Sequence, residues 1–238
     1  MGRPARQRPA SAVDAPLAAW NDRMYLQHPT PYENGIAGAI QRARVRTVLK
    51  LARVVTTDAV LEIGCEAGRL IASLPNVRRI VGVDISSAAL DDAERRLETR
   101  LEPIELHYLD AQNPLPFERG EFDLIICSEM LEHVRQPRAV LENIWAIADQ
   151  NTRIVVTVPI EAPKVWSKRI LHRLGLMNVL FRGIEAGRSE WHLQAFSQGM
   201  LRNLTTDLFE RIRLRNVWGA HWVALFKARP RTGASSLD

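Results

Sequence analysis

The alternation of short apolar runs with helical segments constrains the fold of this chain more than any other feature. Five runs predict strands, near residues 59–65, 79–84, 104–110, 122–128 and 153–159. Residues 124–127 and 154–158 are apolar at almost every position, as expected of strands covered on both faces of a parallel sheet. Helices are predicted between the strands, near 68–74, 87–99 and 137–149. We therefore expect an α/β domain with helices on both faces of its sheet.

The segments on either side of this series complete the predicted sheet. A helix is predicted near 36–55, before the first strand, and another near 197–207. Two further strands, near 209–218 and 221–228, are joined by Gly219 and Ala220, and this short connection predicts an antiparallel hairpin. The prediction is a Rossmann-like, seven-stranded sheet that is mostly parallel, with the C-terminal hairpin at its edge.

One domain with two tails and an insert is predicted. The domain spans residues 17–230, and residues 1–16 and 231–238 are expected to be disordered; the first tail is basic and rich in Arg, Pro and Ala. Residues 161–190 are predicted to be a lid or a substrate-recognition segment. Within this insert, basic and bulky apolar residues alternate at helical spacing over 164–181, which suggests peripheral contact with a membrane.

Composition limits the class of protein. The net charge is +5, but the basic residues are scattered, so a nucleic-acid partner is not favoured. The chain has no apolar run as long as a membrane span and no apolar segment typical of a secretory signal. Cys65 and Cys127 follow apolar runs and are expected to be core residues in a reducing compartment. The expected location is the cytoplasm.

Polar residues and glycines follow four successive strands. They are Glu62 with Gly64 and Gly68, then Asp84, then Asp110 with Ala111, then Ser128 with Glu129. Ligands of open α/β sheets bind beyond the carboxyl ends of the strands, so these signals predict one binding crevice. Asp84 follows Gly64 at the spacing typical of an acidic residue that binds a ribose diol. A dinucleotide motif would need glycine at Glu66 and Arg69, and this excludes a dinucleotide.

With these motifs, the chain resembles the class I S-adenosylmethionine-dependent methyltransferases over residues 36–228, and within them the type 11 group that includes ubiquinone-biosynthesis enzymes. The matching motifs are Val60-Leu61-Glu62-Ile63-Gly64, Gly82-Val83-Asp84-Ile85-Ser86, Leu109-Asp110-Ala111, and Phe122-Asp123-Leu124-Ile125 followed by Glu132-His133-Val134. The resemblance implies S-adenosylmethionine as co-substrate.

The resemblance also implies a role for each strand end. Glu62, Gly64 and Gly68 would belong to the turn that passes the methionine part of the cofactor. Asp84 would accept hydrogen bonds from the ribose, and Ile85 would pack on the adenine. Asp110 and the Ala111 N–H would bind the adenine edge, and Ser128 would lie near the sulfonium.

One residue departs from the family pattern. Most members have glycine where this chain has Glu66, and glycine allows a positive φ and a close approach of the backbone. Glutamate there also adds a carboxylate near the cofactor. The departure keeps open a non-catalytic relative that binds a cofactor or a partner protein.

The predicted function is methyl transfer to a small-molecule, lipid-linked or sugar acceptor, at oxygen in preference to nitrogen or carbon. A proton must leave the acceptor oxygen, so the candidate catalytic residues are Glu129, His133 and His192. Methylation of RNA is the alternative enzymatic function. The sequence lacks the basic stripe with stacking aromatic residues that would support it.

The motif Glu129-x-x-Glu132-His133 raises the question of a metal. On a helical turn these side chains would share one face, and His192 could add a fourth ligand. The pattern is similar to the magnesium site of polyprenyl-hydroxyphenol O-methyltransferases and to that of small-RNA 3′-end 2′-O-methyltransferases. The same glutamate and histidine occur in metal-independent members, so a divalent cation is the less favoured interpretation and no metal ligand is assigned.

Overall fold

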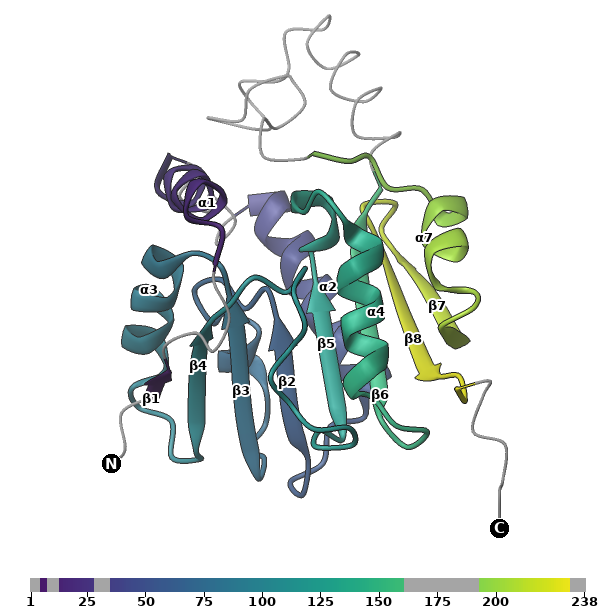
Figure 1. The fold of residues 1–238 in the computed structure, drawn as a ribbon, viewed down its shortest axis with the longest axis horizontal. Coiled ribbons are helices and arrows are strands. Elements are labelled where there is room, and N and C mark those ends of the chain that lie inside the picture. The colour runs from purple at the N-terminus through teal and green to yellow at the C-terminus, as the bar shows by residue number, and fades with distance from the viewer. Residues whose placement is uncertain (1–4, 8–12, 28–34, 161–192, 232–238) are drawn as a thin grey trace, which may run out of the picture.

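The computed structural model describes residues 5–7, 13–27, 35–160 and 193–231 (Figure 1). Eight strands form one sheet in the order β1-β4-β3-β2-β5-β6-β8-β7. The strands are β1 (Ala5–Gln7), β2 (Ala59–Ile63), β3 (Arg79–Asp84), β4 (Ile104–Tyr108), β5 (Leu124–Ser128), β6 (Arg153–Pro159), β7 (Phe209–Val217) and β8 (His221–Ala228). The helices are α1 (Ala15–Gln27), α2 (Gly35–Ala52), α3 (Ser87–Leu97), α4 (Pro137–Ile147) and α7 (Gln198–Thr205). The predicted insert, 161–190, lies outside the described residues.

The sheet reverses its direction of growth between β2 and β5. From β2, the chain adds β3 and β4 on one side, and β5 and β6 on the other, all parallel to their neighbours. β8 then pairs antiparallel with both β6 and β7. The predicted Rossmann-like sheet, mostly parallel with an antiparallel C-terminal hairpin, is confirmed.

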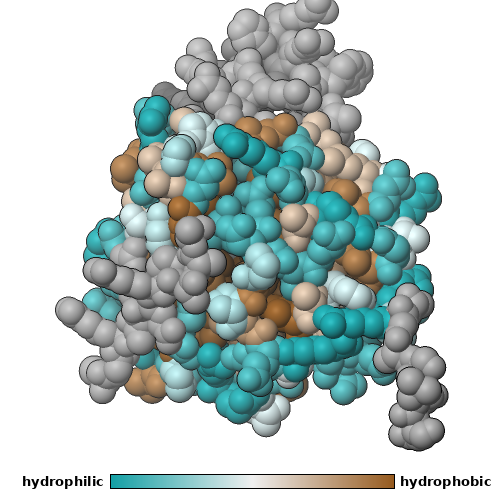
Figure 2. Space-filling model, viewed as in Figure 1, coloured by the Kyte–Doolittle hydropathy of each residue, from teal (hydrophilic) through white to brown (hydrophobic). Residues whose placement is uncertain are grey.

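Helices cover both faces of the sheet and bury two apolar clusters. One cluster joins α2 and α3 to the sheet through residues such as Val48, Leu90 and Ile126. The other joins α4 and α7 through residues such as Ile144, Leu201 and Phe226. Figure 2 shows that the outer surface on the α4 side is mostly hydrophilic, with its apolar residues in small separate groups. Cys65 and Cys127 are both free and buried, as expected of core residues.

The segment after the first strand differs from its prediction. The expected helix near 68–74 is only a single 3₁₀ turn, Ile71–Ser73. Leu74 is extended at ψ 145° because it precedes Pro75, and the residue before a proline is disfavoured in the helical region. The glycine turn is therefore not followed by the N-terminus of an α-helix.

The N-terminal segment also differs from its prediction. Within residues 1–16, which were expected to be disordered, Ala5–Gln7 form β1 and α1 begins at Ala15. β1 pairs parallel with the free edge of β4, from Ala5 beside Glu105 to Gln7 beside His107. Backbone hydrogen bonding to an open edge needs no apolar side chains, so the composition of the tail gave no sign of it.

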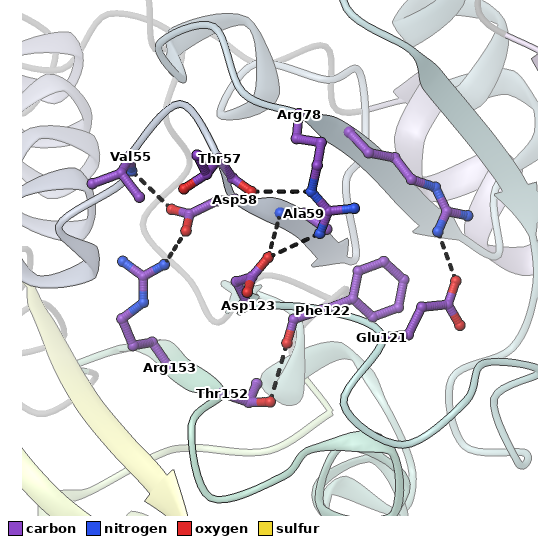
Figure 3. A network of polar contacts seen from close by, with 11 residues as sticks. Val55, Thr57, Asp58, Ala59, Arg78, Glu121, Phe122, Asp123, Thr152 and Arg153 are labelled. Carbon is purple, nitrogen blue, oxygen red and sulfur yellow. Dashed lines mark hydrogen bonds and ion pairs between the residues drawn. The ribbon is translucent and has the colours of Figure 1, made fainter.

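A polar network joins the amino ends of the parallel strands (Figure 3). Asp58, buried before β2, accepts hydrogen bonds from the Val55 N–H at 2.8 Å and from the Arg153 guanidinium at 2.5 Å. Asp123, before β5, accepts from the Ala59 N–H at 2.8 Å and from Arg78 at 3.2 Å. These bonds fix the strand starts relative to one another, at the end of the sheet opposite the predicted crevice.

Helices long and apolar enough to cross a membrane are absent from the described part of the chain.

We predict that Asp58→Ala lowers the free energy of unfolding by about 2–3 kcal/mol, because the Arg153 guanidinium and the Val55 N–H lose a charged partner. Urea unfolding followed by circular dichroism measures the change. Glu210→Ala, at an exposed position of β7, is the control and should alter stability little. Equal stability of the two variants would contradict the role given to Asp58.

Candidate active site

The turn after β2 meets the segment after β5 at the switch point of the sheet. Gly64 has φ +74°, and a Cβ there would lie 2.7 Å from both Cβ and Cγ of Met130. Gly68 has φ +68° and packs against Leu97 and Ala93 of α3. Both glycines therefore meet a backbone and packing requirement that other residues would not. Ligands of open α/β sheets bind at this position, between the diverging connections.

Asp84 holds the glycine turn against the end of β3. Its Oδ2 accepts the Glu66 N–H and its Oδ1 accepts the Ser86 N–H, both at 2.8 Å. The N–H groups of Gly64 and Cys65 donate to the Val83 carbonyl, at 2.8 and 3.0 Å. Glu66 itself adopts φ +47°, in the region that usually requires glycine. The turn therefore forms in this chain without the family's glycine.

Three carboxyl groups gather around this turn. Burial is the main cause that raises the pKa of Glu62, of Glu66 and of Asp84 above their ordinary values. Mutual repulsion adds to the effect, because Asp84 raises the pKa of both glutamates. Glu62 Oε2 is buried without a hydrogen-bond partner among the described residues. The site therefore has an excess of acidic groups, with Glu62 buried and Glu66 and Asp84 half-buried, which favours a cationic ligand.

Arg44 on α2 supplies positive charge to the same site, and the sequence motifs did not reveal it. The arginine lowers the pKa of Glu62 and of Glu66, against the effect of burial. Its guanidinium also donates to Ser128 Oγ at the end of β5, and its Nε–H donates to Gln41 Oε1 at 2.8 Å. Arg44 therefore connects the carboxyl ends of β2 and β5 across the switch point. A basic residue in an amphipathic helix carries no sequence signal for this contact.

The predicted adenine-side residues lie around the ends of β3 and β4. Asp110 is buried, and its Oδ1 accepts from the backbone and side-chain nitrogens of Gln112, at 2.9 and 3.1 Å. Ala111 is buried, and its carbonyl accepts from Asn143 of α4 at 2.9 Å. Ile85, directly after β3, is partly exposed. These residues form the flank of the candidate site on the β4 side.

Helix α1 is tied to the same flank. Asp22 accepts from the Ser86 hydroxyl at 2.6 Å and from the Ala88 N–H at 3.1 Å, at the start of α3. Tyr25 donates to Asp92 of α3 at 2.5 Å. A helix that lies before β2 in the chain thus borders Asp84, and the sequence did not predict this position.

The candidate catalytic residue Glu129 follows β5 in an unusual backbone conformation. Its φ is +54°, which residues other than glycine rarely adopt. Glu129 Oε1 accepts from the Thr157 hydroxyl at 3.0 Å, and Oε2 lies 2.9 Å from His221 Nε2. Neither Thr157 nor His221 was identified from the sequence. The carboxylate is therefore held by β6 and β8 as well as by its own strand.

The other two candidates differ in how far the structure places them. His133 ends a 3₁₀ turn, Leu131–His133, and its Nε2 lies 3.9 Å from Oε1 of the buried Glu132. His192 lies outside the described residues. The next residue, Leu193, donates its N–H to the Glu132 carbonyl at 2.8 Å, so the chain returns to this turn after the insert. Among the described residues, no group of three or more His, Cys, Asp or Glu side chains is arranged to hold a metal ion.

One stretch of the sequence and the overall fold match known methyltransferases. Residues 60–151 match the family model of the methyltransferase domain. N-methyltransferase NodS from Bradyrhizobium japonicum, solved with S-adenosyl-L-homocysteine, has the same fold at a TM-score of 0.63 and 18% identity, over 91% of this chain and 100% of that one. Magnesium protoporphyrin IX methyltransferase from Synechocystis, also with that ligand, superposes with a TM-score of 0.60 and 16% identity, over 89% and 94%.

Two relatives in sequence are named as O-methyltransferases. A ubiquinone biosynthesis O-methyltransferase from Pasteurella multocida is 32% identical over 150 residues, which are 59% of this chain and 62% of the relative. The enzyme of that name from Aromatoleum aromaticum is 35% identical over 34% of this chain and 36% of its own length. The chain thus spans less than two thirds of these relatives. The methyltransferase domain matched over residues 60–151 agrees with the resemblance of the motifs to the class I S-adenosylmethionine-dependent methyltransferases.

We predict that Asp84→Ala weakens the binding of S-adenosylhomocysteine about 10- to 100-fold, the equivalent of roughly 1.5–3 kcal/mol for a hydrogen bond to a charged group. Titration calorimetry measures the affinity, and a thermal melt confirms that the variant is folded. Asp91→Ala, on the exposed side of α3, is the matched control. Unchanged affinity of the Asp84 variant would remove its assignment to the ribose.

We predict that Glu66→Gln stabilises the ligand-free protein at neutral pH. The folded state raises the pKa of Glu66, so ionisation favours the unfolded state once the pH exceeds the ordinary value of 4.5. The stabilisation should therefore be small near pH 4.5 and grow as the pH rises. Thermal melts from pH 4.5 to 8 measure it, with Glu98→Gln as an exposed control. A pH-independent difference would contradict the buried charge.

Proposed function

We propose that the protein transfers the methyl group of S-adenosylmethionine to a hydroxyl oxygen of a small-molecule acceptor. The observation that carries the proposal is the gathering of polar groups at the switch point. Asp84 accepts from the Glu66 N–H, and Arg44 lowers the pKa of Glu66 and donates to Ser128, the residue before Glu129. The name of the relatives, ubiquinone biosynthesis O-methyltransferase, supports oxygen as the acceptor atom.

The residues present fit this co-substrate. The buried, unpartnered Oε2 of Glu62 can accept from an ammonium group, and Arg44 can bind a carboxylate, so the two ends of an amino acid have partners. Asp84 would hold the ribose, and Asp110 with the Ala111 N–H would hold the adenine. Gly64, Gly68 and Ile85 would shape the surface, and Ser128 would lie near the transferred group. When bound, the co-substrate supplies a methyl group on a sulfonium, which needs no further activation.

The protein's part in the chemistry is orientation and removal of one proton. The acceptor is held beside the end of β5, where positioning alone supplies much of the rate. Glu129 takes the hydroxyl proton of the acceptor as the oxygen gains the methyl group. His133 borders the same turn, and His192 stays a prediction because it lies outside the described residues. The excess of acidic groups favours the cationic co-substrate over its neutral thioether product.

The finer nature of the acceptor rests on the insert. Basic and bulky apolar residues at helical spacing in 164–181 support an acceptor that is carried by a lipid, with peripheral contact to an anionic membrane surface. A sugar acceptor is the alternative.

We predict that the protein binds S-adenosylmethionine and methylates 3,4-dihydroxybenzoate, a catechol, faster than 3,4-diaminobenzoate, its amine counterpart. Calorimetry measures binding, and mass spectrometry of the products measures transfer and the atom methylated. An excess of chelator should leave turnover unchanged, and loss of activity there would support the metal instead. Failure to bind S-adenosylmethionine would overturn the enzymatic function, and preferred methylation of the amine would overturn the oxygen assignment.

A further inference from the structure

His221 is a buried histidine at the sheet edge where the active site lies. It is the first residue of β8 and pairs with Pro159 of β6 and Val217 of β7. Only 3% of its surface is exposed, and its Nε2 lies 2.9 Å from Glu129 Oε2. Because β8 runs antiparallel to β6, the start of β8 lies at the carboxyl ends of the parallel strands. A residue far along the chain is thereby brought to the candidate base.

The hydrogen bonds around Glu129 have one consistent direction. The Arg44 guanidinium has no acceptor, so it donates to Ser128 Oγ. The Ser128 hydroxyl can then donate to Thr157 Oγ1 at 3.1 Å, and the Thr157 hydroxyl donates to Glu129 Oε1 at 3.0 Å. His221 Nε2–H donates to the other oxygen. Each oxygen of an ionised Glu129 thus receives a donor.

The backbone supports the same conclusion. Glu129 adopts φ +54°, and its N–H donates to Thr157 Oγ1 at 3.0 Å and to the Thr157 carbonyl at 3.2 Å. A non-glycine residue in this region costs free energy, and such positions cluster at functional sites. If the side chain of His221 served only to pack β8, an apolar residue would serve better. His221 instead leaves its Nδ1 buried without a hydrogen-bond partner among the described residues.

We propose that His221 is a positioning residue that fixes the carboxylate of Glu129 for proton removal from the acceptor. This inference rests on the proposed function. In the step that Glu129 performs, the O–H bond of the acceptor breaks and its proton bonds to a carboxylate oxygen. The electron pair left on the acceptor oxygen forms the bond to the methyl carbon, and the bond from that carbon to sulfur breaks with its electron pair left on the sulfur. His221 donates from Nε2 throughout and exchanges no proton with the acceptor.

The first test observes the pair in the ligand-free protein. Long-range ¹H–¹⁵N NMR of the full chain distinguishes histidine tautomers, and His221→Gln identifies the signal of His221. We expect a proton on Nε2 of His221 and a shift of that signal in Glu129→Gln. The His107 signal is the internal control, because its Nε2 also lies near a glutamate, 3.6 Å from Glu105 Oε2 on β4. This signal should not shift in Glu129→Gln. A His221 signal that does not respond to Glu129→Gln would overturn the proposal.

The second test separates positioning from structure. With S-adenosylmethionine and 3,4-dihydroxybenzoate, we expect His221→Leu to lower kcat about 10- to 100-fold, within the contribution typical of a general base. KM and the affinity for S-adenosylhomocysteine should not change. His221→Gln places an amide N–H where Nε2 was and should restore kcat to within about threefold. His107→Gln is the control for loss of a buried histidine and should leave kcat unchanged.

The outcomes are distinct. If His221→Leu does not fold, His221→Asn takes its place, because its shorter amide does not reach Glu129. Normal kcat in a folded Leu or Asn variant, or a Gln variant as slow as Leu, would overturn the positioning role. No binding of S-adenosylhomocysteine by the unaltered protein would overturn the proposed function and the role together, while the NMR signals would still report the Glu129–His221 pair as a structural contact.

Discussion

The parallel pairing of β2 with both β3 and β5 is the constraint on which the rest of the structure depends. Because β3 follows β2 on one side and β5 is added on the other, the connections after β2 and β5 diverge from a single point. The glycine turn, Asp84 and Glu129 all owe their position to that divergence. The helices on both faces then bury the strands and keep the pairing in register.

The balance between acidic and basic side chains is the second constraint on the candidate site. Burial opposes ionisation of Glu62, Glu66 and Asp84, whereas Arg44 favours ionisation of the two glutamates. A family glycine at position 66 would remove one of these charges. This chain instead holds a glutamate in a left-handed conformation and binds its N–H to Asp84. The turn is therefore preserved by hydrogen bonding, and its electrostatics differ from those of the family pattern.

The sequence patterns predicted the elements whose structure depends on residues close together in the chain. Apolar runs located β2, β5 and β6, since burial on both faces leaves a direct mark on composition. The short connection at Gly219 and Ala220 indicated the hairpin of β7 and β8, although β7 is mostly exposed. The helix expected near 68–74 did not form, because Gly68 adopts φ +68° at its start and Pro75 limits its end. Arg44, Thr157 and His221 could not be found from sequence, because each enters the site through pairing or packing over a long separation. Likewise, β1 arises from an open edge of β4, which only the folded sheet possesses.

The network at the amino ends of the strands has a consequence for how this protein can change. Asp58, Asp123 and Arg153 secure the strand starts at one end of the sheet, and the candidate site lies at the other. Rigidity and selectivity thus reside in separate parts of one scaffold. New acceptor preferences can arise by replacing residues around the crevice while the opposite end continues to define the fold, which makes this chain a suitable starting point for laboratory evolution.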